Sequence, residues 1–291
     1  MPELPEVEVT RRRIAPALVG RTVRDVLTTR DSYFFLTPPA RLRRSLRGRR
    51  VQSLARLGKY LVADTDQGGR LLLHLGMTGQ LFSSDAVSVR LLSAAARSAL
   101  LHEEQRAFRP DAHTHLRLRF ADGGPEVFLR DVRKFGKVQL LAPGERSPRL
   151  ERLGRDALEL TGDDLFAASR GRVVAAKTLL LDQSVVAGSG NIYADEALFL
   201  AGVRPTRRAG RLRRAECDRI ADAMRAVMLR SIETGGSSIS DYVAPDGRDG
   251  AYQDERRVYA RTGEPCPVCG RAVVRVVLGQ RSAHYCPRCQ R

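Results

Sequence analysis

The sequence predicts an α+β fold, in which an N-terminal helix and a β-sandwich precede a helical domain and a metal-binding ribbon. Three observations support this order. Short β-type segments separated by turn residues fill the first half of the chain, as they do in sandwiches and barrels. The hydrophobic pattern becomes helical beyond residue 150. Two Cys-x-x-Cys pairs lie close to the C-terminus, which is typical of a small module held together by a metal ion.

The first expected element is a helix over residues 5–19. Pro5 is accepted in a first helical turn, Glu6 and Glu8 favour the positive end of the helix, and a glycine follows its last residue. Gln-Gly-Gly and Asp-Gly-Gly turns separate several of the segments that follow, and these segments read as short strands. The expected strands are residues 22–27, 33–36, 51–57, 60–64, 71–75, 115–120 and 126–129.

Two segments interrupt this pattern. Residues 86–108 are rich in Ala and Leu and contain neither Gly nor Pro, which predicts a helix inserted between strands, and no role follows from its sequence. Residues 141–150 are rich in Pro, Gly, Ser and charge, which predicts a hinge. Beyond it, residues 215–233 place apolar side chains on one helical face. Cys217 lies on that face, and we interpret it as a small core residue.

The charge balance is strongly basic. The chain has 50 Lys and Arg against 33 Asp and Glu, a formal net charge of +17, and such an excess attracts nucleic acid. A codon usage that favours arginine would explain why arginine is more frequent than lysine. It does not explain why basic residues outnumber acidic ones. No stretch reaches the roughly 18 apolar residues of a membrane span, and the N-terminus lacks a secretory signal. We therefore expect a cytoplasmic protein with a nucleic-acid partner and no membrane.

Four of the five cysteines predict a metal site. In each Cys-x-x-Cys pair, two thiolates from one tight turn can bind the same tetrahedral ion. The segment between the pairs reads as two short strands around residues 279–280, and Arg281 at this turn suits a phosphate contact. Redox dithiols or a disulfide pair are the alternative, which the paired spacing disfavours. A site made only of cysteine is closed, so we expect one structural Zn²⁺. Its ligands are Cys266, Cys269, Cys286 and Cys289.

The N-terminus is a candidate reaction centre. Proline at position 2 permits removal of Met1, which would expose a secondary amine. An α-amino group titrates near ~8, so an appreciable fraction is neutral and nucleophilic at neutral pH. Glu3 could move protons at the same centre, and Glu6 lies one helical turn further on. Taken alone, however, Pro2 and these carboxylates are explained as well by a helix start.

Several segments, in order along nearly the whole chain, resemble the formamidopyrimidine-DNA glycosylases. The first begins PELPEVE at residue 2, and the others contain GKYL, HLGMTG, DVRKFG and GNIYADE. The four-cysteine ribbon follows them. The inserted residues 86–108 depart from the family's shorter connection.

The resemblance implies a helix–two-turn–helix domain between the sandwich and the zinc ribbon. On this basis we place the domain boundaries. The expected parts are a catalytic β-sandwich domain over 1–140, a hinge over 141–150, a helix–two-turn–helix DNA-binding domain over 151–260 and a zinc ribbon over 261–291.

The family's activity implies a bifunctional DNA glycosylase and AP lyase of base excision repair. Such an enzyme removes 8-oxoguanine and formamidopyrimidines from double-stranded DNA by turning the damaged nucleotide out of the helix. By resemblance, the nitrogen of Pro2 forms a Schiff base with the sugar, and Glu3 protonates the ring oxygen before β,δ-elimination. Lys59 and Arg281 complete the catalytic set, and Glu6 supports it.

The same resemblance assigns DNA contacts. Met77, Arg133 and Phe135 would fill the space left by the flipped nucleotide, with Phe135 as an apolar wedge and Arg133 bonded to the orphaned cytosine. On spacing alone, Met77 and Phe135 would read as ordinary core. A second group of residues would contact the DNA phosphates, and such contacts carry no information about the base sequence. This group is Lys59, His74, Lys134, Asn191 and Arg281, with Lys177 on the same surface.

Two other functions stay open. The endonuclease VIII relatives remove oxidised pyrimidines and usually begin Pro-Glu-Gly-Pro, so Leu4 favours the purine branch. Residues 235–253 also resemble the loop that covers 8-oxoguanine in that branch. A catalytically silent DNA-binding relative is the second alternative, and the presence of both Pro2 and Glu3 argues against it. We expect a monomer that acts at the bacterial nucleoid.

Overall fold

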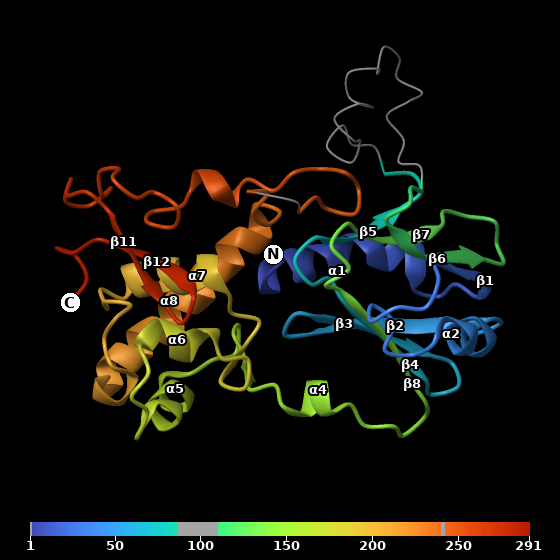
Figure 1. The fold of residues 1–291 in the computed structure, drawn as a ribbon, viewed down its shortest axis with the longest axis horizontal. Coiled ribbons are helices and arrows are strands. Elements are labelled where there is room, and N and C mark those ends of the chain that lie inside the picture. The colour runs from blue at the N-terminus through green and yellow to red at the C-terminus, as the bar shows by residue number, and fades with distance from the viewer. Residues whose placement is uncertain (1, 87–109, 240–241) are drawn as a thin grey trace, which may run out of the picture. The chain divides into compact units, whose positions relative to one another are not determined.

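The computed structural model describes residues 2–86, 110–239 and 242–291 (Figure 1). The expected helix over 86–108 lies, apart from its first residue, outside this range. The chain forms two compact units, one of Met1–Ser147 with Thr234–Ala251 and one of Pro148–Glu233 with Tyr252–Arg291. The break after Ser147 falls inside the segment expected as a hinge.

Residues 234–251 depart from the expected domain boundaries, which place them in the second domain. They pack instead with the first unit. Polar and apolar contacts hold them there. The Glu6 carboxylate accepts a hydrogen bond from the backbone N–H of Ser237 at 2.9 Å. Arg13 forms an ion pair with Asp246 at 2.8 Å, and Val243 packs in a buried apolar cluster of this unit.

The first unit begins with helix α1 (Leu4–Leu18). Its start is fixed by a capping box, in which the Glu6 carboxylate accepts a hydrogen bond from the backbone N–H of Glu3 at 2.8 Å. Its end is followed by Gly20, whose φ of 82° suits the residue after a helix. One face of α1 is buried against the sheets and includes Val7, Ile14 and Leu18.

Two four-stranded antiparallel sheets form the sandwich, as the sequence predicts, and their facing side chains make one hydrophobic core. Helix α2 (Pro39–Leu46) packs beside the first strand. One sheet has the order β1 (Val23–Thr28), β6 (Thr114–Phe120), β7 (Val127–Asp131) and β5 (Gly79–Ser83). The other has the order β2 (Val51–Leu57), β3 (Tyr60–Thr65), β4 (Arg70–His74) and β8 (Lys137–Leu141).

Residues 33–36 do not form the strand that their composition predicts. They form a turn, and Phe35 makes a single bridge to Val138 of β8. Phe34 and Phe35 are buried in the core while Tyr33 and Leu36 are exposed, so this turn uses its apolar character to anchor two rings rather than to pair as a strand. Strands β5 and β8 were not expected, because each directly follows a glycine-containing loop that resembles a turn more than a strand.

Glu8 gives α1 a pH-dependent link to the sheet. Its carboxylate lies 2.7 Å from Arg11 and from Arg12, and 3.3 Å from Arg56 on β2. Burial raises the pKa of Glu8, but its hydrogen bonds and ion pairs with Arg11 and Arg12 outweigh this and lower the pKa to about 2.

A carboxyl group whose pKa is lower in the folded than in the unfolded protein stabilises the fold at pH values above its unfolded pKa. This stabilisation is lost as the pH falls through the pKa of the folded protein. Glu8→Gln should therefore unfold at lower urea than the wild type at neutral pH. The difference should shrink between about pH 4.5 and about pH 2. Glu159→Gln, at an exposed carboxylate, is the control and should show little difference at any pH. A constant difference for Glu8→Gln across this range would contradict the prediction.

The second unit is mainly helical. Helices α5 and α7 pack against the long helix α8, which the periodicity of residues 215–233 predicts. Every helix in the described ranges is too short or too polar to span a membrane. The unit contains α4 (Pro148–Glu151), β9 (Arg155–Asp156), α5 (Gly162–Ser169), α6 (Ala176–Leu181), β10 (Val186–Ala187), α7 (Asn191–Leu200), η3 (Ala209–Arg211), α8 (Arg214–Glu233), η4 (Tyr252–Asp254) and the ribbon strands β11 (Val274–Leu278) and β12 (Arg281–Tyr285).

Candidate active site, DNA contacts and zinc centre

Pro2 and Glu3 lie at the N-terminal end of α1, and both are buried. Glu3 is the N-cap residue, so its position is fixed by the first helical turn. The exposed backbone N–H groups of this turn give the helix start a partial positive charge. The structure therefore holds the candidate nucleophile and the candidate proton donor side by side, next to a positive helix end.

Glu6 joins this helix start to the loop over 234–251. One carboxylate oxygen accepts the N–H of Glu3 and the other accepts the N–H of Ser237. Gly236 has a φ of 89°, and a Cβ there would lie 3.0 Å from the Tyr242 ring and 3.2 Å from Glu6. Only glycine fits this conformation without strain. The loop that resembles a lesion cover is thus anchored directly beside Pro2 and Glu3.

Lys59 and His74 lie at the same end of the second sheet. Lys59 follows Gly58 in the turn between β2 and β3, and its side chain is 8% exposed. His74 ends β4 opposite Tyr60 in the strand register, and the two rings are 4.7 Å apart. The N–H of Gly76 donates to His74 Nδ1 at 3.1 Å, which fixes the imidazole orientation.

The loops carrying Met77 and Phe135 are clamped together. A Cβ on Gly76 would lie 2.5 Å from the backbone of residues 135 and 136, so the two loops can approach only because residue 76 is glycine. Asp131 is fully buried and accepts hydrogen bonds from the backbone N–H of Gly136 at 2.7 Å and from the hydroxyl of Thr78. Asp131 is a positioning residue that the sequence analysis did not single out, although it begins the matched segment DVRKFG.

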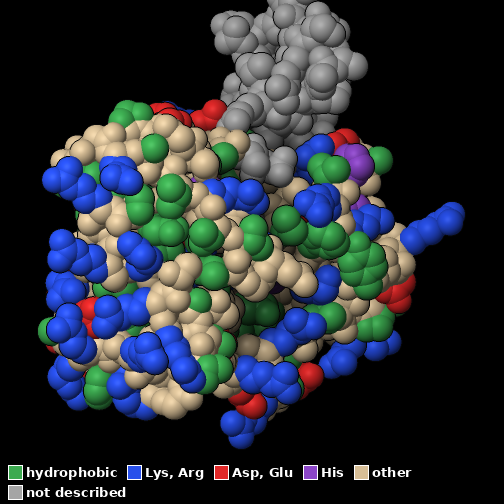
Figure 2. Space-filling model, turned by 60° about the vertical axis from the view of Figure 1, so that its left-hand side comes forward, with side chains coloured by type: hydrophobic (Ala, Val, Ile, Leu, Met, Phe, Trp, Pro, Cys, Tyr) green, Lys and Arg blue, Asp and Glu red, His purple; other side chains and the backbone are tan. Residues whose placement is uncertain are grey.

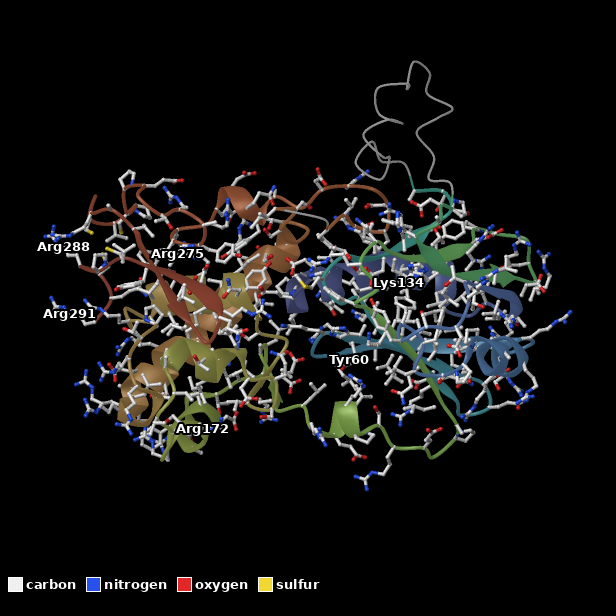
Figure 3. The ribbon with its side chains drawn as sticks, in the orientation of Figure 1. Tyr60, Lys134, Arg172, Arg275, Arg288 and Arg291 are labelled. Atoms are coloured by element: carbon white, nitrogen blue, oxygen red, sulfur yellow. The ribbon has the colours of Figure 1, made fainter. Side chains whose placement is uncertain are left out.

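The tip of this pair of loops presents an aromatic ring and basic groups. The Phe135 side chain is 43% exposed, which is unusual for phenylalanine. The Arg133 guanidinium lies 4.6 Å from the centre of its ring. Lys134 (labelled in Figure 3) lies between them in the sequence, and its φ of 56° places its backbone in the left-handed region. An exposed ring beside two cations suits contact with stacked bases and phosphates.

Lys177 is not where the sequence analysis expects it. Its side chain has no exposed surface, and its ammonium lies 2.7 Å from the equally buried Asp195 carboxylate. It also donates to the backbone carbonyl of Ser282 on β12. The other oxygen of Asp195 accepts the N–H of His284 at 2.9 Å. An ammonium with no exposed surface, already paired with a buried carboxylate, cannot contact a phosphate. The prediction that Lys177 contacts DNA is therefore wrong, and Lys177 ties α6, α7 and the ribbon together.

Breaking this pair should destabilise the second unit. Lys177→Met leaves the Asp195 charge buried, and we expect a loss of about 3–5 kcal/mol in the free energy of unfolding. The double variant Lys177→Met/Asp195→Leu should lose less, because neither charge remains unpaired. Chemical denaturation of both variants provides the measurement. A single variant within about 0.5 kcal/mol of the wild type would contradict the buried ion pair.

Asn191 and Arg281 are the remaining candidate phosphate contacts. They begin α7 and β12, two of the elements that the Lys177–Asp195 pair joins. Asn191 is the first residue of α7 and follows a glycine-rich turn, where backbone N–H groups point away from the helix. Arg281 is exposed at the tip of the ribbon. It precedes Ser282, whose carbonyl Lys177 holds, and Asn191 lies one turn before Asp195. On the face shown in Figure 2, Lys and Arg side chains are far more frequent than Asp and Glu.

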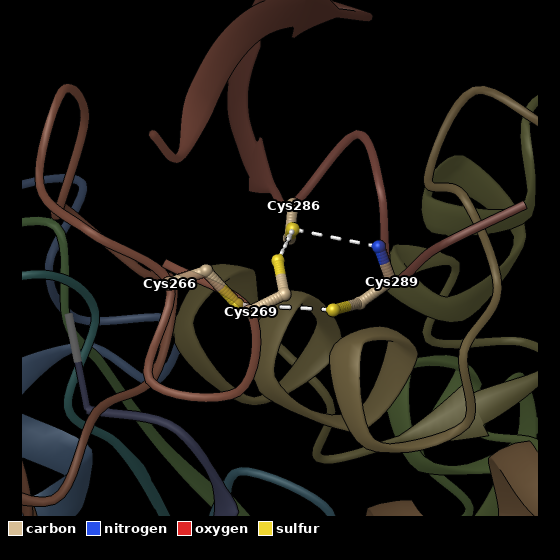
Figure 4. A group of neighbouring side chains, drawn as sticks. All are labelled: Cys266, Cys269, Cys286 and Cys289. Carbon is tan, nitrogen blue, oxygen red and sulfur yellow. Dashed lines mark hydrogen bonds between the residues drawn. The ribbon is translucent and has the colours of Figure 1, made fainter. Parts of the chain in front are cut away.

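The four cysteines of the ribbon converge on one point (Figure 4). Their sulfur atoms all lie within 4.8 Å of one another. The Sγ atoms of Cys269 and Cys286 are 3.4 Å apart, and those of Cys266 and Cys289 are 3.9 Å apart. Tetrahedral zinc with Zn–S bonds of about 2.3 Å places sulfur atoms about 3.8 Å apart, so the cluster fits this ion.

One thiol of the cluster favours the form that binds zinc. Burial raises the pKa of Cys286, but the backbone N–H groups of Cys289 and Arg288 and the neighbouring thiols lower it to about 7, which favours the thiolate. Burial and the neighbouring thiols raise the pKa of Cys289 to about 12, so the fit to a metal rests on the geometry of the four sulfur atoms. The prediction of one structural zinc site is confirmed. Cys217 is buried in α8, as expected for a core residue.

Comparison with known proteins identifies the family. The family models of the formamidopyrimidine-DNA glycosylase N-terminal domain and H2TH domain match residues 1–138 and 153–243, and the zinc finger found in FPG and IleRS matches residues 263–291. The formamidopyrimidine-DNA glycosylases of Stenotrophomonas maltophilia (strain K279a) and Cupriavidus pinatubonensis are 41% and 43% identical to this chain, and each alignment covers 100% of both proteins.

Solved structures agree with this assignment. The MutM (Fpg) protein from Thermus thermophilus is 37% identical, with a TM-score of 0.82 over 99% of this chain and 98% of that chain. A mutant of the Lactococcus lactis FPG, solved in complex with DNA containing Fapy-dG, is 31% identical, with a TM-score of 0.84 over 100% of both chains. Sequence, fold and metal cluster therefore agree, and this chain belongs to the formamidopyrimidine-DNA glycosylase family.

Proposed function

We propose that this protein is a bifunctional DNA glycosylase and AP lyase of base excision repair that removes oxidised purines, such as 8-oxoguanine and formamidopyrimidines, from duplex DNA. The observation that carries the proposal is the buried placement of Pro2 and Glu3 at the start of α1, in a member of this family. The related Lactococcus lactis protein has been solved with DNA containing Fapy-dG or an abasic site, which supports the same class of substrate.

The chemistry starts at the nitrogen of Pro2 once Met1 is removed. The partial positive charge at the start of α1 disfavours a second positive charge and favours the neutral amine. This nitrogen attacks C1′ of the damaged nucleoside. The bond from C1′ to the base breaks, its electron pair leaves with the base, and the base takes up the proton that the amine gives up.

Glu3 then protonates O4′, the sugar ring opens, and C1′ and the Pro2 nitrogen form an iminium ion. The iminium withdraws electrons, so a proton leaves C2′ and the phosphate leaves C3′. In a second elimination, a proton leaves C4′ and the phosphate leaves C5′, which cuts the strand on the other side. Glu6 holds Glu3 and the loop over 234–251 in place, while Lys59 and Arg281 would bind the phosphates that leave.

The DNA contacts follow from the exposed loops. Phe135 wedges into the base step, Met77 fills the space of the flipped nucleotide, and Arg133 bonds to the orphaned cytosine. The hydrogen bonds and ion pairs with DNA phosphates add affinity without sequence preference. Their donors are Lys59, His74, Lys134, Asn191 and Arg281. All of them belong to one chain, so we infer that a monomer acts on nucleoid DNA in the bacterial cytoplasm.

The substrate preference is tested by single-turnover excision of 8-oxoguanine opposite C and of 5,6-dihydrouracil from otherwise identical duplexes. We expect 8-oxoguanine to be released faster. Faster release of dihydrouracil would instead favour the pyrimidine-preferring endonuclease VIII type. Arg133→Ala should reduce the preference for C opposite the lesion, because it removes the donor to the orphaned base.

A further inference from the structure

A cluster of arginines lies outside the proposed active site, on α2 and the segment after it. Residues 39–50 contain six arginines and no acidic residue. Blocks of like charge repel one another and attract ions of the opposite sign. We call this cluster the α2 arginine patch; it consists of Arg41, Arg43, Arg44, Arg47, Arg49 and Arg50.

The patch faces solvent because the other side of α2 is buried. Leu42 and Leu46 are 0% and 2% exposed and belong to the core of the sandwich. This fixed apolar face leaves the arginines at the surface, where all but the half-buried Arg49 are exposed.

Little in the described structure neutralises this charge. Among the described residues, only Arg41 of the six has an acidic partner, and its distance to the Glu145 carboxylate is 3.8 Å. Arg43 donates to the hydroxyl of Thr28. Arg44 and Arg47 have no side-chain hydrogen bond or ion pair within the described ranges. Arg49 and Arg50 donate to the backbone carbonyls of Ser45 and Gly20, which leaves their charge in place. Within the described residues, the patch is therefore a concentrated positive surface whose charge is offset only by the carboxylate of Glu145.

A pocket of about 200 Å³ opens at the edge of the patch. Two of the arginines, Arg41 and Arg49, line the pocket together with the polar side chains of Ser45, Thr65 and Gln67 and with apolar ones, which belong to Leu46 and to residues 140–143. Within the described ranges, no acidic residue lines it. Guanidinium groups beside hydroxyl and amide groups are the donors that bind phosphate oxygens.

The patch and the candidate lesion site lie at opposite ends of the same sheet. Strand β2 begins at Val51, directly after the patch, and ends at Leu57, close to Lys59. Seven residues at about 3.3 Å each span roughly 20 Å. Figure 1 shows α2 beside one end of these strands, and Tyr60, labelled in Figure 3, lies toward the other end.

We propose that the α2 arginine patch is a second DNA-binding surface, which holds phosphates of a duplex segment other than the one that carries the lesion. Its concentrated guanidinium charge complements the regular phosphate charge of duplex DNA, and binding there releases condensed counterions. It needs no base contacts, so it binds without sequence preference. An enzyme holding two segments at once passes from one to the other without full dissociation. The proposal goes beyond base removal and requires only that the protein binds DNA.

The test asks whether one protein molecule holds two duplexes. The first duplex carries an abasic analogue, covers only the lesion site and bears one dye. The second is undamaged and bears another dye. Native electrophoresis at low salt should show a complex that contains both dyes. Displacement of the first duplex cannot produce this signal, because the displaced duplex leaves the complex.

Arg43→Gln/Arg44→Gln/Arg47→Gln should bind the second duplex at least about tenfold more weakly than the wild type. Its slope of log affinity against log salt should fall by about 2 to 3, since each phosphate contact contributes about 0.9. The matched control removes the same charge at exposed arginines elsewhere and should behave as the wild type. It is Arg24→Gln/Arg149→Gln/Arg152→Gln.

The proposal is overturned if the lesion-bound wild type captures no second duplex, or if the control loses as much affinity as the patch variant. Tighter capture of single-stranded RNA than of duplex DNA would also overturn it. Cleavage of the short lesion duplex should be unchanged in all three proteins. A wild type that does not cleave the short lesion duplex would count against the proposed function. Failure of the proposed function is therefore distinguishable from failure of the second DNA-binding surface.

Discussion

Pro2→Gly should suppress covalent capture of this protein on lesion-containing DNA by borohydride. Borohydride reduces the iminium between the N-terminal nitrogen and C1′ to a stable amine, so capture reports that intermediate directly. Glycine keeps a backbone nitrogen but loses the pyrrolidine ring that makes it a secondary amine of fixed geometry. Retention of Met1 should suppress capture in the same way, because it converts the nitrogen of Pro2 into an amide. Mass spectrometry of the captured and free protein gives the measurement.

Glu3→Gln separates proton transfer from nucleophilic attack. It should lower single-turnover cleavage by about 10²–10⁴-fold, since the amide cannot protonate O4′. DNA binding should persist in both variants and shows that they are folded. An active preparation in which every molecule retains Met1 would rule out the mechanism. A wild type that binds lesion DNA but is never captured would instead identify the catalytically silent relative.

Removing zinc should unfold the ribbon while leaving the β-sandwich folded. The ribbon has almost no core of its own: its apolar cluster is small, and Val277 on β11 is 60% exposed. Binding of structural zinc supplies about 10–16 kcal/mol in comparable small modules, which is more than such a core provides. Cys286→Ser or chelation should therefore release one zinc per chain and displace Arg281. Hydrogen exchange over residues 263–291 and DNA affinity are the measurements.

Cys217→Ser is the matched control, because this cysteine is buried in α8 and lies outside the metal cluster. It should keep one zinc per chain and normal exchange in the ribbon. A Cys286→Ser protein that still holds zinc, with a protected ribbon, would contradict the four-cysteine site.

Much of the fold follows from local pattern. The order of sandwich, helices and ribbon is visible in the sequence, because strand and helix periodicity and turn residues act over a few positions. The errors arose where burial depends on distant segments. Residues 33–36 look like a strand but form a turn that buries only Phe34 and Phe35. Helix α2 is not predicted because arginines dominate its sequence. Helix α2 is held by Leu42 and Leu46, which pack in the core of the sandwich.

The candidate site shows the same division. Matched segments identify which residue types are present, and four cysteines at these spacings are sufficient to predict the metal. The matches do not report exposure. Lys177 lies in a short apolar helix whose sequence is equally compatible with a surface cation, and Asp195, its partner, is distant in the chain.

The sequence alone therefore determined the order of sandwich, helices and ribbon and the zinc ligands, because these are written in adjacent or regularly spaced residues. Pro2 became the candidate nucleophile only through the resemblance of its segment to the family. Only the tertiary structure decided that Lys177 is an internal ion pair, that Asp131 clamps the two loops and that residues 234–251 pack against the start of α1. The physical reason is that charges and hydrogen-bonding groups take their roles from burial and partners. Both arise only when segments far apart in the chain are brought together.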